Sequence, residues 1–148
     1  MKKFITLIAA AALVITAQPA EAVTKVRVLN ADKVSTKNGI VTIGLSGLPK
    51  DHGIYISQCM GIPDGKTEPT ACNPAASSKI WVSNIPADIK MGATPVKGKV
   101  TIKVDKYFKD GDCIHTKCII FVTNDHNAAA DKSENQAIPF KFGGINLF

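Results

Sequence analysis

The sequence predicts an all-β fold, an immunoglobulin-like antiparallel β-sandwich of about seven strands. Three observations support this prediction. Apolar and polar residues alternate along several short segments, turn sequences rich in glycine, asparagine and aspartate separate these segments, and no segment keeps the 3.6-residue period of an amphipathic helix. Short strands at regular spacing without helices are typical of two antiparallel sheets packed face to face.

The clearest strand lies at residues 99–105. Val100, Ile102 and Val104 alternate there with lysine, threonine and aspartate, which gives one apolar and one polar face. Further segments rich in β-branched or aromatic residues predict strands at residues 23–29, 40–45, 53–60, 79–83, 118–124 and 136–142. Turn pairs such as Asn38-Gly39 and Asp110-Gly111 separate them.

Two segments fit no strand. Residues 84–95 place Ile85, Ile89 and Met91 at a spacing that suits a short helical turn, which Pro86 and the later glycine and proline limit. Residues 124–135 are polar and predict a loop, long enough to be mobile or functional.

The N-terminal segment predicts export. Lys2 and Lys3 precede an apolar run at residues 4–16 that is short for a membrane span, and Ala20-Glu21-Ala22 resembles a cleavage site. We expect a signal peptide at residues 1–22 and one domain at residues 23–148, with no membrane span. The protein is therefore expected to be secreted and extracellular, released or loosely associated with the cell surface.

The net charge of +6 comes almost wholly from lysine, because Arg27 is the only arginine. The lysines are scattered along the chain rather than clustered. Arginine serves base and phosphate recognition better than lysine, so the composition disfavours a dedicated nucleic-acid interface and favours a solvated surface.

Four cysteines in an exported chain predict two disulfides, for which three connectivities exist. Cys59 and Cys72 flank a stretch rich in turn residues, and Cys113 and Cys118 are separated by only four residues. Two short local bridges fit this spacing better than two crossing ones. The competing pairing joins Cys59 to Cys113 or Cys118, like the inter-sheet bridge of antibody domains, and stays open.

No constellation for catalysis is convincing, so we expect a non-enzymatic protein without a metal or other cofactor. The cysteines are accounted for by disulfides, which removes a thiol nucleophile. His52, His115 and His126 do not stand in metal-ligand spacing. Asp125-His126 is best explained as part of a solvated loop, and Asp112 as a turn residue.

Four short motifs surround the cysteines and the last predicted strand. They are Gln58-Cys59, Ala71-Cys72-Asn73-Pro74-Ala75, Asp112-Cys113 with four residues before Cys118, and Gln136-Ala137-Ile138-Pro139-Phe140. In their order and spacing they resemble the neocarzinostatin family of apoproteins, over about residues 23–142.

The resemblance implies a seven-stranded immunoglobulin-like sandwich with local disulfides Cys59–Cys72 and Cys113–Cys118. It also implies a cleft beside the first disulfide, in which family members carry a reactive enediyne chromophore that attacks DNA. The protein's part there is to shield an unstable ligand, which needs an apolar concave wall rather than a catalytic group.

The chain departs from the family where the ligand would be gripped. Gly61 stands where the family has tryptophan, Ser77 or Ser78 where it has phenylalanine, and the aromatic-rich loop before the third cysteine is shortened to residues 107–111. We therefore expect the fold to carry over well and the enediyne poorly.

The residues predicted to line a cleft lie beside the first disulfide, on the shortened loop and on the strand after Cys118. They are Met60, Gly61, Ile62, Pro63, Tyr107, Phe108, Ile119, Phe121 and Thr123. Trp81 lies in a strand pattern and is assigned to the core.

The leading hypothesis is a secreted, monomeric carrier that holds or sequesters a small apolar ligand, antibiotic-associated as in the family. The alternative is a cell-envelope or adhesion module that binds a protein or surface partner through residues 61–71 and 124–135. An antibacterial role or DNA contact follows from family analogy alone.

Overall fold

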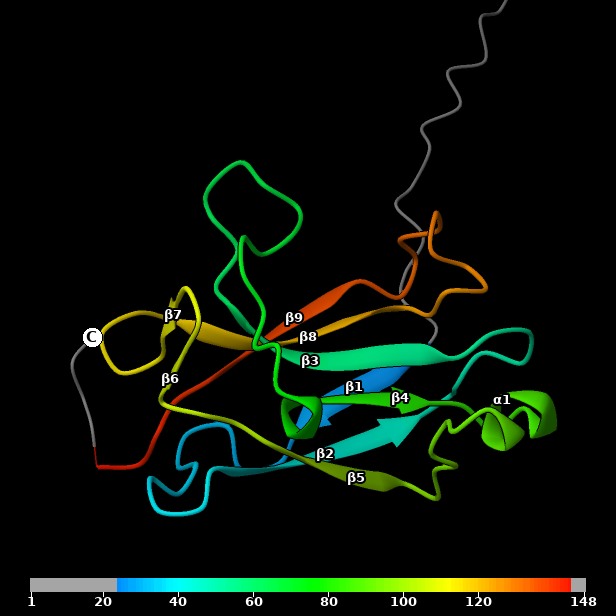
Figure 1. Cartoon of the computed structure of the whole chain (residues 1–148), viewed down its shortest axis with the longest axis horizontal. Coiled ribbons are helices and arrows are strands. Elements are labelled where there is room, and N and C mark those ends of the chain that lie inside the picture. The colour runs from blue at the N-terminus through cyan, green and yellow to red at the C-terminus, as the bar shows by residue number, and fades with distance from the viewer. Residues whose placement is uncertain (1–23, 145–148) are drawn as a thin grey trace, which may run out of the picture.

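The structure, a computed structural model, describes residues 24–144 as two antiparallel sheets with a small hairpin at one end (Figure 1). The first sheet has the order β1-β2-β5, built from β1 (Lys25–Val28), β2 (Ile40–Ser46) and β5 (Lys99–Lys103). The second has the order β4-β3-β8-β9, built from β4 (Lys79–Val82), β3 (Ile54–Met60), β8 (Cys118–Asn124) and β9 (Gln136–Phe140). The expected signal peptide at residues 1–22 lies outside the described residues.

All seven predicted strands occur in the structure, and the prediction of an all-β sandwich is confirmed. Strand β8 has the bounds predicted for it, because a continuous apolar run from Cys118 to Val122 marks a strand buried on both faces. Two short strands were not predicted. They are β6 (Tyr107–Phe108) and β7 (Gly111–Asp112), which pair as a hairpin.

The short helical turn that the sequence allowed within residues 84–95 occurs in the structure, and a second short turn was not predicted. Residues Pro86–Lys90 form one turn of helix, α1, and residues Ala76–Ser78 form a 3₁₀ turn. Pro86 begins α1 instead of preventing it, because proline at the first helical position loses no hydrogen bond and has its φ already set. Gly92, with φ of 108°, follows as the chain leaves the turn.

The core fills the space between the two sheets. Strand β2 contributes Val41 and Ile43 from one side, and β3 contributes Ile54 and Ile56 from the other, all fully buried. Because side chains alternate along a strand, the neighbouring positions point away from this core. On the outward face of the second sheet, some of these side chains are apolar and buried, unlike those of an ordinary solvated sheet.

Candidate ligand-binding cleft

Two loops rise from the same side of the four-stranded sheet. One is the disulfide loop at residues 61–71, between β3 and Cys72, and the other is the polar loop at residues 125–135, between β8 and β9 (Figure 1). The outward face of β3 and β8 lies between them. This places a partly enclosed surface beside the first disulfide, where the sequence predicted a cleft.

The disulfide loop is closed at its base by covalent and hydrogen bonds. Cys59 and Cys72 are bonded with their Cα atoms 3.9 Å apart, and the amides of Met60 and Asn73 donate to the carbonyls of Ala71 and Gln58 at 2.9 and 2.8 Å. Cys113 and Cys118 form the second bridge, with Cα atoms 5.3 Å apart. Both local disulfides are confirmed, and the alternative inter-sheet pairing is wrong.

A buried polar network supports the base of this loop from below. Gln58, which is fully buried, donates through Nε2 to the carbonyl of Asp105 at 2.7 Å, and its Oε1 accepts from the amide of Asp105 at 2.9 Å. The same oxygen accepts from Asn73 Nδ2 at 2.8 Å, and Asn73 also donates to Ser78 Oγ at 2.9 Å. Gln58 Nε2 lies 3.2 Å from Cys113 Sγ, so one side chain links the surroundings of both disulfides.

This network gives a physical reason for two of the motifs. In Gln58-Cys59 and Cys72-Asn73 each cysteine stands beside an amide residue, and the two amides bond to each other across the base of the loop. A buried network of this kind fixes one arrangement when all its members are satisfied, since each unpaired member would cost about 1–3 kcal/mol. The sequence marked these residues as a family motif but gave no sign of their mutual contact.

The floor of the cleft is apolar. Cys59, Ile119 and Phe121 form a second buried cluster on the outward face, separate from the main core, and Ile62 packs against it. The register places Ile119 opposite Cys59 and Phe121 opposite Ser57 on adjacent strands. Strand β8 is therefore buried on both faces because the disulfide loop covers the outer one.

A hollow of about 660 Å³ lies on this floor. Residues of β3, β4 and β8 form its base, and the disulfide loop and the 3₁₀ turn form its wall. The lining residues are Tyr55, Ser57, Cys59, Glu68, Pro69, Cys72, Ala76, Lys79, Ile80, Trp81, Phe121 and Thr123. The hollow falls within the range of sites that hold small organic molecules.

Three rings gather at the far end of the hollow from the disulfide. The ring centroids of Trp81 and His126 lie 5.0 Å apart, and Tyr55 lies 6.2 Å from each of them. The Tyr55 hydroxyl and His126 Nδ1 are hydrogen bonded at 2.8 Å. Partial burial, followed by the nearby charge of Asp125, raises the pKa of Tyr55 above its ordinary value.

The fully buried Asp125 holds this cluster in place. Its Oδ2 accepts from Trp81 Nε1 at 3.0 Å and from the amide of Gly53 at 2.8 Å, and its Oδ1 accepts from the amide of Asn127 at 2.9 Å. The sequence assigned Trp81 to the core, and the structure corrects this. Trp81 faces outward because it pairs with Tyr55, which has the same strand parity as Cys59.

A smaller hollow of about 340 Å³ continues the cleft under the polar loop and shares Tyr55, Glu68, Phe121 and Thr123 with the larger one. An ion pair joins the two walls here, with Lys132 Nζ 2.9 Å from Glu68 Oε1. Both side chains are at least half exposed, so the pair contributes at most about 1 kcal/mol. The loops are bridged, but the bridge is weak enough to open.

The predicted lining residues fall into three groups. Phe121 and Thr123 line both hollows. The second group is Ile119 and Ile62 of the buried cluster, with Gly61 and the exposed Pro63 of the disulfide loop. Gly61 donates its amide to the carbonyl of Lys117 at 2.8 Å, and an added Cβ would lie 3.1 Å from that oxygen, so it joins the loop to the second disulfide.

The third group, Met60, Tyr107 and Phe108, lies away from the hollows. Met60 and Phe108 pack against the main core, and Tyr107 is 57% exposed. Met60 has the same strand parity as the inward-facing Ile54 and Ile56 of β3. For Tyr107 and Phe108 the reason is the unpredicted β6–β7 hairpin, which turns at Asp110 with φ of 62° and folds the Phe108 ring over Gly111. A Cβ at Gly111 would overlap that ring, so any larger residue there would have to displace Phe108.

The aromatic end of the cleft was not predicted from the sequence. Tyr55, Trp81 and His126 come from three separate segments of the chain. The one sequence signal was the alternation of side chains along a strand. Tyr55, Ser57 and Cys59 occupy alternate positions and point to the same face, so a cleft beside Cys59 would extend to Tyr55.

Among the described residues, no three His, Cys, Asp or Glu side chains are grouped as a metal site. The Asp112–His115 pair, with Oδ2 2.8 Å from Nδ1, lies exposed on the Cys113–Cys118 loop. The hydrogen bond from His115 and the amides of His115 and Ile114 lower the pKa of Asp112, and both amides donate to Oδ1 as in a turn.

In the described part of the chain no helix has the length and apolar character needed to cross a bilayer.

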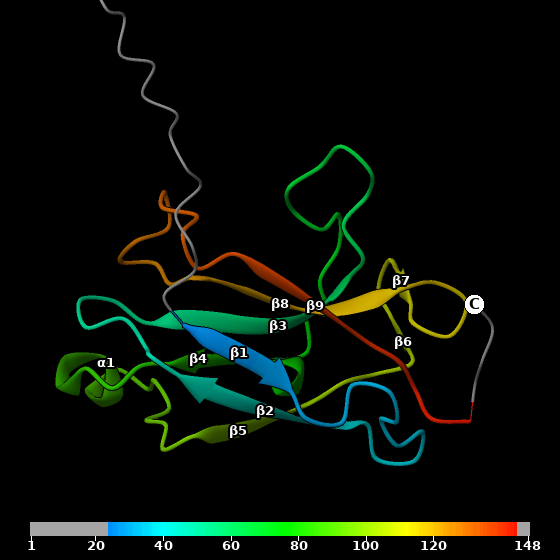
Figure 2. The same cartoon turned by 180° about the vertical axis from the view of Figure 1, so that it is seen from behind.

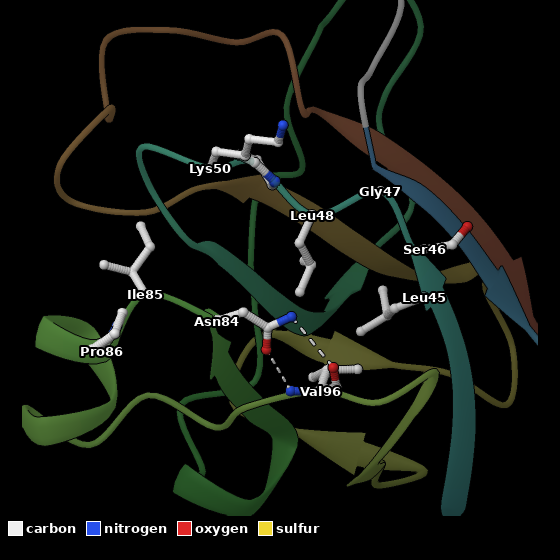
Figure 3. Close-up of a pocket in the computed structure, with 10 residues that line it drawn as sticks. Leu45, Ser46, Gly47, Leu48, Lys50, Asn84, Ile85, Pro86 and Val96 are labelled. Carbon is white, nitrogen blue, oxygen red and sulfur yellow. Dashed lines mark hydrogen bonds between the residues drawn. The ribbon is translucent and has the colours of Figure 1, made fainter.

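A different hollow, of about 460 Å³, lies between residues 45–50 and the segment that leads into α1 (Figure 3). Asn84 lies in it, but its side chain bonds to both backbone groups of Val96, at 2.9 and 3.3 Å. The polar groups there hold neighbouring segments together, so this hollow is a weaker candidate than the cleft.

Comparison with known proteins supports the fold. No protein-family model matches the chain, and no curated protein matches it. Among solved structures, macromomycin and apokedarcidin are similar, each with 22% identity and a TM-score of 0.50. The matches cover 81% of this chain and 99% of macromomycin, and 82% of this chain and 100% of apokedarcidin.

Both are proteins of the neocarzinostatin family. The resemblance found in the sequence motifs is therefore confirmed as a likeness of fold: the chain has the sandwich of these apoproteins, with two local disulfides.

Proposed function

We propose that this protein is a secreted, non-catalytic binding protein that carries or sequesters a small, largely apolar ligand in the cleft beside Cys59–Cys72. One observation carries the proposal: an apolar hollow of about 660 Å³ lies on an outward sheet face that would otherwise be solvated. A fold of this kind hosts many functions, so the proposed function rests on the residues of the cleft rather than on the fold.

The chemistry of the hollow indicates the kind of ligand. Phe121, Pro69 and Ala76 offer apolar surface, and Trp81 with Tyr55 offers ring faces at one end. The aromatic residues that the family places near the disulfide are absent, and the rings of this chain stand on the opposite side. A ligand with a flat ring system seated against Trp81 fits this arrangement, and it need not be an enediyne.

Filling the hollow tests the proposal. Ser57 lies on its floor, and Ser57→Trp would occupy the space without removing a contact that holds the sheet. Thr36→Trp introduces the same ring at an exposed turn position outside the cleft and outside both sheets. The probe is 8-anilinonaphthalene-1-sulfonate, followed by its own fluorescence. We expect binding to the parent, at least about ten-fold weaker binding to Ser57→Trp, and unchanged binding to Thr36→Trp.

Two outcomes of this fluorescence titration would contradict the proposed function. No binding to the parent protein, or equal binding to both tryptophan variants, would overturn the cleft as a ligand site. In that case the exposed residues 63–68 and the polar loop would favour the alternative function, recognition of a surface partner. Native mass spectrometry of protein purified from its own culture medium would identify a retained natural ligand.

A further inference from the structure

The outward face of the other sheet gathers the scattered basic residues of the sequence. Lys25 and Arg27 of β1 and Lys99 and Lys103 of β5 are all exposed on it. The register places Arg27 opposite Gly44 and Gly44 opposite Lys99, so one row across three strands has a cation at each side and a glycine, without a side chain of its own, in the middle. Along one strand, the Cα atoms of residues i and i+2 are about 7 Å apart. Across the sheet, Cα atoms on strands separated by one intervening strand are about 10 Å apart.

These positive charges are not balanced on their own sheet. Strands β1, β2 and β5 contain no aspartate or glutamate. Within residues 24–144 one lysine–carboxylate ion pair and two histidine–carboxylate contacts occur, and none of them involves Lys25, Arg27, Lys99 or Lys103. The four cations therefore project a positive field from one flat surface, which favours an anionic partner.

Two large aliphatic side chains stand among these cations. Leu29 is 50% exposed and Ile40 is 39% exposed. The amide of Leu29 donates to the carbonyl of Thr42 at 2.8 Å, its side chain lies beside Gly44, and Ile40 is opposite Lys103. The face thus combines basic and exposed aliphatic residues, with an open hollow of about 750 Å³ next to Arg27.

We propose that the outward face of β1, β2 and β5 binds the surface of an anionic lipid bilayer. Lysine and arginine beside such a surface each add attraction, and exposed aliphatic side chains gain by entering the headgroup boundary. A soluble polyanion would require the cations alone and would leave Leu29 and Ile40 without a role. The inference is independent of the proposed cleft, which opens on the opposite side of the sandwich and would stay accessible to a ligand.

Co-sedimentation with lipid vesicles tests this proposal, using the chain from Val23 onward, which contains every strand of the described structure. The vesicles are pure phosphatidylcholine, or phosphatidylcholine with a third of phosphatidylglycerol. We expect binding to the anionic vesicles only, and loss of binding in 1 M salt. Arg27→Gln with Lys99→Gln should weaken binding about 30-fold, since each cation contributes about five-fold.

The matched control removes two exposed lysines elsewhere, by Lys90→Gln with Lys109→Gln, and should leave binding within about three-fold of the parent. Leu29→Ser with Ile40→Ser should weaken vesicle binding about ten-fold while heparin binding is unchanged. The proposal is overturned if the control pair costs as much as the face pair, or if the aliphatic pair has no effect, which would indicate a soluble polyanion. All six positions are exposed, and thermal unfolding would verify that each variant is folded.

Discussion

The two sheets of the sandwich turn different outward faces to their surroundings. On the first sheet, β1, β2 and β5 lie side by side (Figure 2). Their outward positions are mostly exposed, polar and basic, as alternation along a solvated strand requires. On the second sheet, the outward side chains of Cys59, Ile119 and Phe121 are buried, because a disulfide loop lies over them. The same strand periodicity therefore yields an open surface in one sheet and a covered cleft in the other.

The difference comes from the connections rather than from the strands. Strands of the first sheet are joined to their neighbours without a covering loop, whereas β3 and β8 lead into loops that are anchored by a disulfide, by the Gln58 network and by Asp125. An apolar outward face is tolerated only where such anchors keep it covered. Removing the anchors should make the second face behave like the first.

The largest effect is expected from Gln58→Leu. This change leaves the half-buried amide and carbonyl of Asp105 without their Gln58 partner, at a cost of about 1–3 kcal/mol for each unpaired group, while Asn73 keeps its bond to Ser78 Oγ. We expect the free energy of unfolding to fall by about 4 kcal/mol in urea denaturation. Gln136→Leu is the matched control: its half-buried amide donates to the carbonyl of Thr24, and we expect a loss of about 1 kcal/mol. Equal losses in both variants would mean that the network does not anchor the loop.

The next effect is expected from Cys59→Ala with Cys72→Ala. Opening a loop whose cysteines are 13 residues apart should lower the free energy of unfolding by about 3 kcal/mol. It should also uncover Phe121 and weaken the binding of 8-anilinonaphthalene-1-sulfonate, while vesicle binding by the basic face stays as in the parent. Cys113→Ala with Cys118→Ala opens a shorter loop and should cost about 2 kcal/mol with less effect on the cleft. If the first variant also lost vesicle binding, the two faces would not be independent.

The sequence predicted the strands better than the faces. Alternation located β5 within two residues, because Val100 and Ile102 have polar neighbours on both sides. Alternation assigns faces poorly in β4, where Ile80 and Trp81 are adjacent and either could face the core, so Trp81 was assigned wrongly. The loop at residues 107–111 gave no strand signal, since β6 and β7 have two residues each and are formed by a turn. The basic face was also beyond prediction, because register brings Arg27 and Lys99 together from segments 72 positions apart in the chain.

The smallest effect concerns the titration of Tyr55, which reports how far the cleft face is closed. Partial burial and the charge of Asp125 raise the pKa of Tyr55, so the folded protein holds this proton more tightly than the unfolded chain. The resulting stability is fully present below the unfolded pKa of about 10 and is lost as the pH rises through the folded value. In a Tyr107→Phe background Tyr55 is the only tyrosine, and absorbance at 295 nm should give a midpoint above 10.

The same midpoint distinguishes a covered cleft from an open face. A ligand seated against Trp81 and Tyr55 would remove more water from the Tyr55 hydroxyl, because the two rings stand together at the end of the hollow. Saturating 8-anilinonaphthalene-1-sulfonate should therefore raise the midpoint further, and in the Ser57→Trp variant the probe should cause no such rise. A midpoint at or below 10 would show that water reaches Tyr55 as freely as it reaches the basic face, and the contrast between the two sheets would then not extend beyond the disulfide end of the cleft.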